Sequence, residues 1–289
     1  MSTPNSNKST PSTRVKLSYS SMNTLQSCEA KYCHNKVYNS PKDADYEESD
    51  ALGLGKAFHG VLEKNLHKSY SEQDIISAMV EFNVPTSDKD LLTTMLKKYV
   101  EFRVLSGIKV VKCELQITTH NYNGFIDYIA VSGNKWYIGD LKTTARHDES
   151  ILSRLPLDPQ LNLYAHFADQ IDIVVPEIVG LEFAGCLYSQ ITKSKAGTQK
   201  GLDAGVKVVE TFVPIESMNP DMMWKLFEDA QLRAEELHAG EAPKKNFGSC
   251  MAYFSPCQFF SQCHGSTFTD NRNKVKVTTL ETLKDEELL

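Results

Sequence analysis

The chain has 289 residues, of which 41% are hydrophobic and 24% charged, a composition typical of a globular protein with one large core or two small ones. No apolar run approaches the ~20 residues of a membrane span, and no secretory signal precedes the first polar segment, so we expect a cytoplasmic protein without membrane contact. The formal net charge of −6 argues against a protein that coats nucleic acid, but not against an enzyme with a local basic groove.

The first part of the chain alternates between polar tails and helical patterns. Residues 1–13 are rich in Ser, Thr, Asn and Pro, so we expect a disordered tail there, and we expect a second flexible tail over 269–289. Between them we predict one domain over 14–268. Its apolar residues recur at helical spacing, which predicts helices over 18–32, 51–68, 72–83 and 88–105.

The pattern then changes to the two-residue period of strands. It predicts strands over 109–118, 124–131 and 135–142, with a hairpin turn at Gly133 and Asn134. Beyond these we expect a helix over 157–170, strands over 178–191 and 205–213, and a helix over 219–239. This order indicates a single α/β domain with a sheet flanked by helices.

An Asp-x-Lys motif ends the third predicted strand. Asp140 and Lys142 are two residues apart on a strand, so both side chains point to one face. Asp127, in GFIDY on the preceding strand, can converge with Asp140 through the tight turn. Two carboxylates beside an amine suit Mg²⁺ or Mn²⁺, although a lone Asp-x-Lys is also a common surface pair.

Other polar residues accompany this motif. Gln160 and Tyr164 are four apart and share one face of a predicted helix. His59 borders the apolar stripe of the helix over 51–68, where an ordinary interfacial histidine is the simpler interpretation. Glu114, on the first predicted strand, is either an inward-facing acid or a cross-strand pairing residue.

Seven cysteines are unevenly distributed along the chain. An odd number in a cytosolic protein argues against a disulfide framework. Cys113 and Cys186 lie in apolar, strand-like runs and are expected to be core residues. Cys250, Cys257 and Cys263 follow the spacing C-x6-C-x5-C, which is too loose for the usual C-x2-C zinc knuckle.

The ordered series of His59, GFID, GDLKT and Q-x-x-x-Y resembles the PD-(D/E)XK nucleases of the RecB-like branch. The segment SYSSMNTLQSCEAKY is similar to the opening of the iron–sulfur members, namely the AddB nuclease domain and the CRISPR-associated RecB-like exonucleases. Glu29 stands where these members have proline. The resemblance covers residues 18–264 and implies the restriction-endonuclease-like core, a mixed central sheet flanked by helices, with an N-terminal helical part and a C-terminal iron–sulfur segment.

The resemblance also implies roles for single residues. Lys142 would orient or activate the attacking water and stabilise charge on the phosphate, and Gln160 and Tyr164 would position the lysine or the DNA strand. The Mg²⁺ or Mn²⁺ ligands would come from His59, Asp127, Asp140, the carbonyl of Leu141, and Glu114.

A second cofactor follows from the same resemblance. Cys28 stands where the iron–sulfur members have their first cysteine, so Cys28, Cys250, Cys257 and Cys263 would hold a [4Fe–4S] cluster. Zinc in a Cys₄ site is the alternative. Cys33 or His264 could replace one ligand, and the cysteines could also be bystanders.

We therefore expect a metal-dependent DNA exonuclease that acts on single-stranded or duplex ends. No G-x-x-x-x-G-K-[ST] motif of a helicase motor occurs, which favours a stand-alone nuclease of phage or CRISPR type, with protein partners in recombination or replication. The alternatives are a structure-specific endonuclease and a non-catalytic DNA-end-binding subunit.

Overall fold

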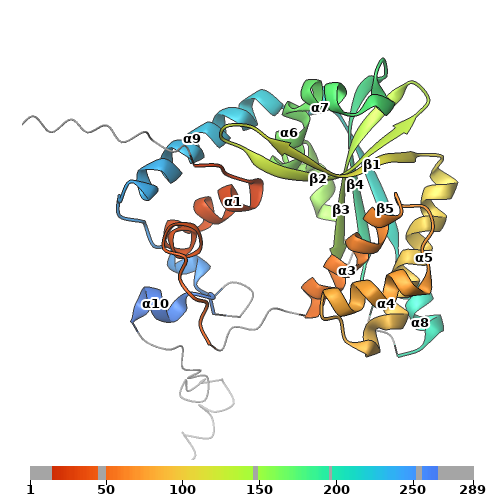
Figure 1. The fold of residues 1–289 in the computed structure, drawn as a ribbon, viewed down its shortest axis with the longest axis horizontal. Helices are drawn as coiled ribbons and strands as arrows, with labels where there is room; N and C mark the ends of the chain where they lie inside the picture. The colour runs from red at the N-terminus through yellow and green to blue at the C-terminus, as the bar shows by residue number, and fades with distance from the viewer. Residues whose placement is uncertain (1–14, 45–49, 146–148, 195–196, 252–255, 266–289) are drawn as a thin grey trace, which may run out of the picture. The chain divides into compact units, whose positions relative to one another are not determined.

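The structure is a computed structural model that describes residues 15–44, 50–145, 149–194, 197–251 and 256–265 (Figure 1). The chain divides into two compact units, of which unit 1 comprises Met1–Gln26 and Glu47–Ala242, and unit 2 comprises Ser27–Tyr46 and Pro243–Leu289. The tails predicted over 1–13 and 269–289 lie outside the described residues, and the domain limits 14–268 stay a prediction. None of the helices in the described ranges is long and apolar enough to cross a membrane.

The described strands of unit 1 form one five-stranded sheet in the order β1-β2-β3-β4-β5. Their bounds are β1 (Lys109–Thr118), β2 (Asn123–Ser132), β3 (Lys135–Thr144), β4 (Glu182–Thr192) and β5 (Val208–Pro214). β3 and β4 are parallel and the other neighbours are antiparallel, so the sheet is mixed, as expected for the α/β core.

The hairpin between β2 and β3 is confirmed. Ser132 pairs with Lys135, which leaves a two-residue turn at Gly133 and Asn134. Gly133 has a φ of +60°, a left-handed conformation that glycine adopts without the steric cost of a Cβ atom.

Helices cover both faces of the sheet. The larger core cluster joins Tyr128 and Leu141 of the sheet to residues of four helices, which are α3 (Asp50–Lys64), α4 (Glu72–Glu81), α5 (Lys89–Ser106) and α8 (Gln199–Gly205). Leu187 of β4 belongs to this cluster, whereas its neighbour Cys186 contacts the carbonyl of Leu161 on α6 (Pro159–His166). Since neighbouring strand residues point to opposite faces, α6 lies on the other face, where it packs against α9 (Pro220–His238).

Local sequence signals set several helix ends. Ser71 and Asp74 form a reciprocal capping box at the start of α4. Asp158 caps α6 and Pro159 occupies its first turn, where a missing N–H costs nothing. α5 ends at Gly107, which has a φ of +67°.

Two predicted helices are interrupted. The helix expected over 18–32 is α1 (Tyr19–Ser27) and α2 (Glu29–Tyr32), because the backbone of Cys28 is extended between them, and a π-helical turn, η1 (Cys33–Val37), follows. The helix expected over 157–170 is split at Phe167. It comprises α6 and α7 (Ala168–Val174), preceded by the 3-10 segment η3 (Glu149–Leu157).

The strand predictions needed smaller corrections. β4 begins at Glu182 rather than at 178, because the 3-10 turn η4 (Pro176–Ile178) and Gly180, with a φ of +79°, precede it. Helix α8 was not predicted, and β5 accordingly begins at Val208. The remaining short 3-10 segments are η2 (Thr86–Asp88), η5 (Ile215–Ser217) and η6 (Phe247–Ser249).

Unit 2 joins segments from both halves of the chain. α2 and η1 come from its first segment, and η6 and α10 (Phe260–His264) come from its second. The amide of Ala30 donates to the carbonyl of Lys244 at 3.2 Å, and the amide of Asp43 donates to the carbonyl of Gln258 at 2.8 Å. Residues far apart in the sequence are thereby held in one small unit.

Candidate active site and candidate cluster site

The two motif aspartates lie where β2 and β3 separate. Tyr128 and Gly139 form the last pair of that ladder, so Asp127 and Asp140 are the first residues beyond it. The carboxylate of Asp127 accepts a hydrogen bond from the amide of Leu141 at 2.7 Å. The structure therefore brings both carboxylates to one point, as the sequence predicted.

Asp140 is completely buried, with an exposed fraction of 0%. Its Oδ1 accepts a hydrogen bond from Lys142 Nζ at 2.8 Å, whereas its Oδ2 has no hydrogen-bond partner among the described residues. Burial raises the pKa of Asp140 to about 6, although Lys142 opposes the rise. A buried carboxylate oxygen without a partner is costly, and a cation beside it would offset that cost.

Lys142 belongs to a chain of hydrogen bonds that runs through α6. Its Nζ donates to Gln160 Oε1 at 2.9 Å, and Gln160 Nε2 donates to the Tyr164 hydroxyl at 2.7 Å. Tyr164 in turn donates to the carbonyl of Phe125 on β2 at 2.5 Å. Because each member fixes the next, the amine is held at a defined position beside Asp140.

The electrostatic balance keeps Lys142 charged. Desolvation lowers the pKa of Lys142, but the carboxylates of Asp140 and Asp127 outweigh this effect and raise that pKa above its ordinary value. The amine is therefore a cation at neutral pH and cannot accept a proton. It can donate hydrogen bonds and neutralise negative charge.

His59 reaches the same site from α3. Burial lowers the pKa of His59, the charge of Lys142 lowers it further, and a hydrogen bond to the backbone of Leu141 partly opposes both. The imidazole is therefore neutral at pH 7, which is the form that binds metal ions. The role of His59 as a metal ligand stays a prediction.

Glu63 is a site residue that the sequence reasoning missed. Burial raises the pKa of Glu63 to about 8, and a hydrogen bond with Glu114 raises it as well. The sequence shows only that Glu63 follows His59 by four residues and so shares its face of the helix, a spacing that does not by itself indicate a site.

Glu114 lies in an irregular part of β1. Its φ is +47°, and the ladder with β2 omits it between the pairs Cys113–Tyr128 and Leu115–Ile126. A glutamate in this region is strained, which is a feature found at functional sites. Its charge also contributes to the raised pKa of Asp127, which burial principally causes and which reaches about 6.

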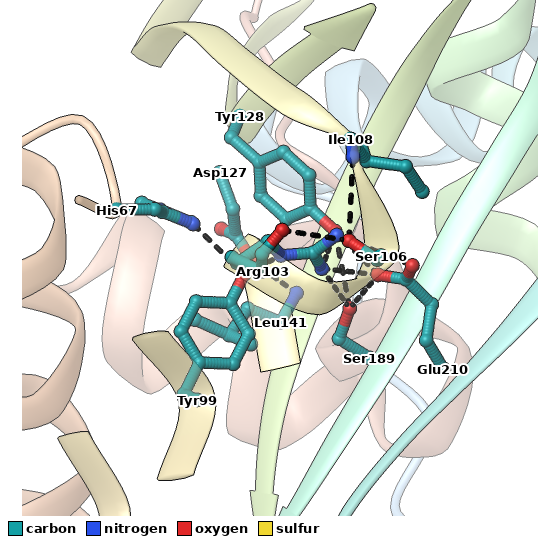
Figure 2. A network of polar contacts seen from close by, with 10 residues as sticks. All are labelled: His67, Tyr99, Arg103, Ser106, Ile108, Asp127, Tyr128, Leu141, Ser189 and Glu210. Atoms are coloured by element: carbon teal, nitrogen blue, oxygen red, sulfur yellow. Dashed lines mark hydrogen bonds and ion pairs between the residues drawn. The ribbon is translucent and has the colours of Figure 1, made fainter. Parts of the chain in front are cut away.

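Figure 2 shows a buried polar network around Arg103, with Asp127 and Leu141 beside it. The guanidinium of Arg103 on α5 donates to Tyr99, Tyr128 and Ser189 at 2.8, 2.9 and 3.0 Å, and it forms an ion pair with Glu210 on β5. The side chains of Arg103 and Glu210 are only 4% and 7% exposed. A charge pair this deeply buried is strongly destabilising when only one partner is removed.

This network adjoins the backbone of the site. Tyr128 directly follows Asp127, and Ser189 pairs with Leu141, the residue between Asp140 and Lys142. The network therefore fixes the strands that carry both aspartates.

The thiols of Cys28, Cys250, Cys257 and Cys263 gather in unit 2. Burial raises the pKa of Cys250, and the thiols of Cys257 and Cys28 raise it further. Burial also raises the pKa of Cys263, and the other three thiols add to this, although Lys245 opposes it. The amide of Cys257 donates to the carbonyl of Cys250 at 2.8 Å, which fixes part of this arrangement.

The other candidate ligands are placed differently. Cys33 is fully buried and hydrogen-bonds to Tyr38. His264 Nε2 lies 3.5 Å from Cys250 Sγ, so the histidine borders the thiol group. In unit 1, Cys186 is a buried core residue as predicted, and Cys113 packs against the main core cluster.

Neither the residues around Asp140 nor the four cysteines form a preformed metal site among the described residues. In the parts of the chain that the structure describes, no three His, Cys, Asp or Glu side chains are already arranged to hold a metal ion. The assignments of metal ligands and cluster ligands stay predictions.

Comparisons with known proteins agree with this geometry. The family model of the PD-(D/E)XK nuclease superfamily matches residues 16–264. Among solved structures, a protein from Eubacterium rectale named as a candidate exonuclease is similar in fold, with a TM-score of 0.52 and 12% identity over 98% of both chains. No curated protein matches the sequence.

Proposed function

Because the chain belongs to the PD-(D/E)XK nuclease superfamily, we propose that it is a divalent-metal-dependent DNA exonuclease that hydrolyses phosphodiester bonds from single-stranded or duplex ends. One observation carries this proposal. One carboxylate oxygen of Asp140 has no partner among the residues that the structure describes, and the other accepts from Lys142, the first member of the hydrogen-bonded chain with Gln160 and Tyr164. We assign the protein to DNA recombination, replication or processing.

The donor set fits Mg²⁺ or Mn²⁺. Carboxylates, a backbone carbonyl and a neutral imidazole are suitable ligands for such ions, and we assign this role to His59, Asp127, Asp140, the carbonyl of Leu141, and Glu114. When bound, the cation would neutralise charge on the phosphate and lower the pKa of the attacking water. Glu63 would keep Glu114 oriented through their hydrogen bond.

The residues of the chain itself would orient the phosphate. The charged amine of Lys142 can donate to a non-bridging phosphate oxygen and stabilise the charge that builds up there. Gln160 accepts from this amine, and Tyr164 anchors Gln160 to β2, so the amine is already oriented before DNA arrives. The catalytic group is thus Lys142, while Gln160 and Tyr164 position it.

A cleavage assay on three DNA forms tests the function. End-labelled linear single strands and duplexes should be degraded from their ends with Mg²⁺ or Mn²⁺, and EDTA should stop the reaction. Circular single-stranded DNA should resist, because an exonuclease has no end at which to start. Cutting of the circle at the linear rate would mean a structure-specific endonuclease, and binding of ends without cleavage would mean a non-catalytic subunit.

We further propose that Cys28, Cys250, Cys257 and Cys263 hold a [4Fe–4S] cluster in unit 2. The raised pKa values of Cys250 and Cys263, to which Cys28 and Cys257 both contribute after burial, support this assignment over Cys33, whose thiol hydrogen-bonds to Tyr38. The cluster would be structural and would join the two segments of unit 2. Zinc in the same Cys₄ site is the alternative.

Colour and metal content test the cluster. Protein purified without oxygen should be brown, with about four irons and four sulfides per chain, as a Cys₄-ligated cubane requires. Cys28→Ser should lose the colour and lower the melting temperature of unit 2, because the cluster closes a very long loop.

The matched control for this prediction is Cys33→Ser, which changes a buried cysteine of the same unit and should keep the colour. Cys186→Ser in unit 1 should keep it as well. A colourless protein with one zinc would refute the cluster and leave the nuclease proposal standing. Colour that survives Cys28→Ser but is lost in Cys33→Ser would show that Cys33, and not Cys28, is the N-terminal ligand of the cluster.

A further inference from the structure

Tyr19 lies beside the candidate active site although it is distant from the motifs in the sequence. Leu17 forms a parallel bridge with Tyr122, in which its amide donates to the carbonyl of Asn121 and its carbonyl accepts from the amide of Asn123, both at 2.9 Å. Because the two segments run parallel, the chain proceeds from Leu17 to Tyr19 in the direction in which β2 runs to Asp127. The N-terminal segment thus lies beside the start of β2 and runs in the direction of the site.

The start of α1 holds Tyr19 in place. Ser18 Oγ accepts a hydrogen bond from the amide of Ser21 at 3.2 Å, which fixes the first turn. The phenol is half-buried and lies in the electrostatic field of Asp158, Lys142 and Asp140. These three residues come from the N-terminus of α6 and from β3, so the phenol lies within electrostatic range of the Asp-x-Lys motif.

The hydroxyl of Tyr19 has no hydrogen-bond partner in the part of the chain that the structure describes. No hydrogen bond to it is present among the described residues, whereas the hydroxyls of Tyr164, Tyr99 and Tyr128 are all bonded. Burial raises the pKa of Tyr19, and the charge of Asp158 raises it further, so the phenol stays protonated above neutral pH. A fixed, half-buried phenol O–H in the field of the cationic amine of Lys142 is suited to donate a hydrogen bond to an anionic oxygen.

We propose that Tyr19 is a substrate-binding residue whose hydroxyl donates a hydrogen bond to a non-bridging oxygen of the DNA phosphate that Lys142 holds. This inference rests on the proposed nuclease function and adds a contact to it. No proton is transferred in this contact, so Tyr19 remains a neutral phenol.

The test uses the full-length protein and the variant Tyr19→Phe, which removes one oxygen atom. Loss of a hydrogen bond to a charged group should lower kcat/KM on a linear oligonucleotide by about tenfold to a hundredfold, mainly through a higher KM. The Kd for the same DNA, measured by fluorescence anisotropy with Ca²⁺ in place of Mg²⁺, should rise in parallel. The melting temperature should not change.

Tyr70→Phe is the matched control. Tyr70 is also partly buried and also lies near a carboxylate, that of Glu101, but it packs against the core cluster under α4 and α5. This variant should match the wild type in both measurements. Tyr19→Leu removes the ring as well, so impairment of Tyr19→Leu with normal Tyr19→Phe would indicate base stacking and overturn the proposal.

A methylphosphonate scan identifies the contacted phosphate. Single neutral linkages should each weaken wild-type binding where a phosphate is contacted. In Tyr19→Phe the sensitivity should fall at one linkage, which is the coupling expected for a direct pair. An equal loss at every linkage, or Tyr19→Phe within twofold of the wild type, would overturn the inference. If the wild type binds DNA but never cleaves it, the proposed function fails, while the binding measurements still decide the role of Tyr19.

Discussion

Asp140→Ala should reduce DNA cleavage by at least about a thousandfold, because it deletes a carboxylate that would hold the metal ion. A bound metal ion stabilises the charge of the transition state by several kcal/mol. The fold should survive. Oδ2 of Asp140 is buried without a partner among the described residues, so its removal relieves an unfavourable burial. The variant also loses the 2.8 Å bond from Lys142 to Oδ1, but the lysine side chain is 39% exposed and keeps its hydrogen bond to Gln160. We therefore expect a melting temperature close to that of the wild type. Asp127→Ala should show the same loss of activity.

The melting temperature of unit 1 can be followed separately. The chain contains two tryptophans, Trp136 on β3 and Trp224 on α9, and both belong to unit 1. Their fluorescence therefore reports the unit that carries the site, whatever unit 2 does. Full activity of Asp140→Ala, or a large fall in this melting temperature, would contradict the assignment.

Lys142→Ala is the matched contrast to Asp140→Ala. It removes the amine but leaves the candidate ligands, so it should still bind Mn²⁺ by calorimetry while cleaving at least about a hundredfold more slowly. Gln160→Ala and Tyr164→Phe should have milder effects, since they act through the lysine. Near-normal turnover of Lys142→Ala would mean that Lys142 is only a surface residue.

The fold was predictable where residues close in sequence decide it. The three strands from β1 to β3 and their hairpin follow from a two-residue period and from Gly133, and they are confirmed within a few residues. The helix breaks at Cys28 and Phe167 were not predictable, because neither residue is a helix breaker by itself. Tertiary packing decides both.

The site was predictable as far as motifs and resemblance reach. Asp127, Asp140, Lys142 and the Gln160–Tyr164 pair are together in the structure. Glu63 was missed, because helical spacing to His59 has no meaning until burial and a partner acid are known. Tyr19 was missed for another reason: a bridge between segments about 100 residues apart cannot be read from either segment alone.

The Arg103–Glu210 pair illustrates a further limit of sequence reasoning and leads to the largest expected effect on stability. Nothing in the sequence indicates that these residues are partners, since the strands β1 to β4 lie between them along the chain. Glu210→Ala should leave the guanidinium of Arg103 buried without a counter-charge. The expected cost is about 3–5 kcal/mol, which corresponds to a fall of roughly 6–20 °C in the melting temperature reported by the tryptophans.

Two comparisons decide whether the buried charge is the cause. Glu72→Ala breaks an ion pair of 2.7 Å with Lys89 on the exposed surface, and the melting temperature should hardly move, since water already solvates both groups. The double variant Arg103→Met with Glu210→Leu removes both charges and should recover most of the stability lost in Glu210→Ala. Recovery should be incomplete, because Tyr128 and Ser189 keep their mutual hydrogen bond of 3.1 Å but lose the guanidinium. A double variant no more stable than Glu210→Ala would assign the loss to packing rather than to the uncompensated charge.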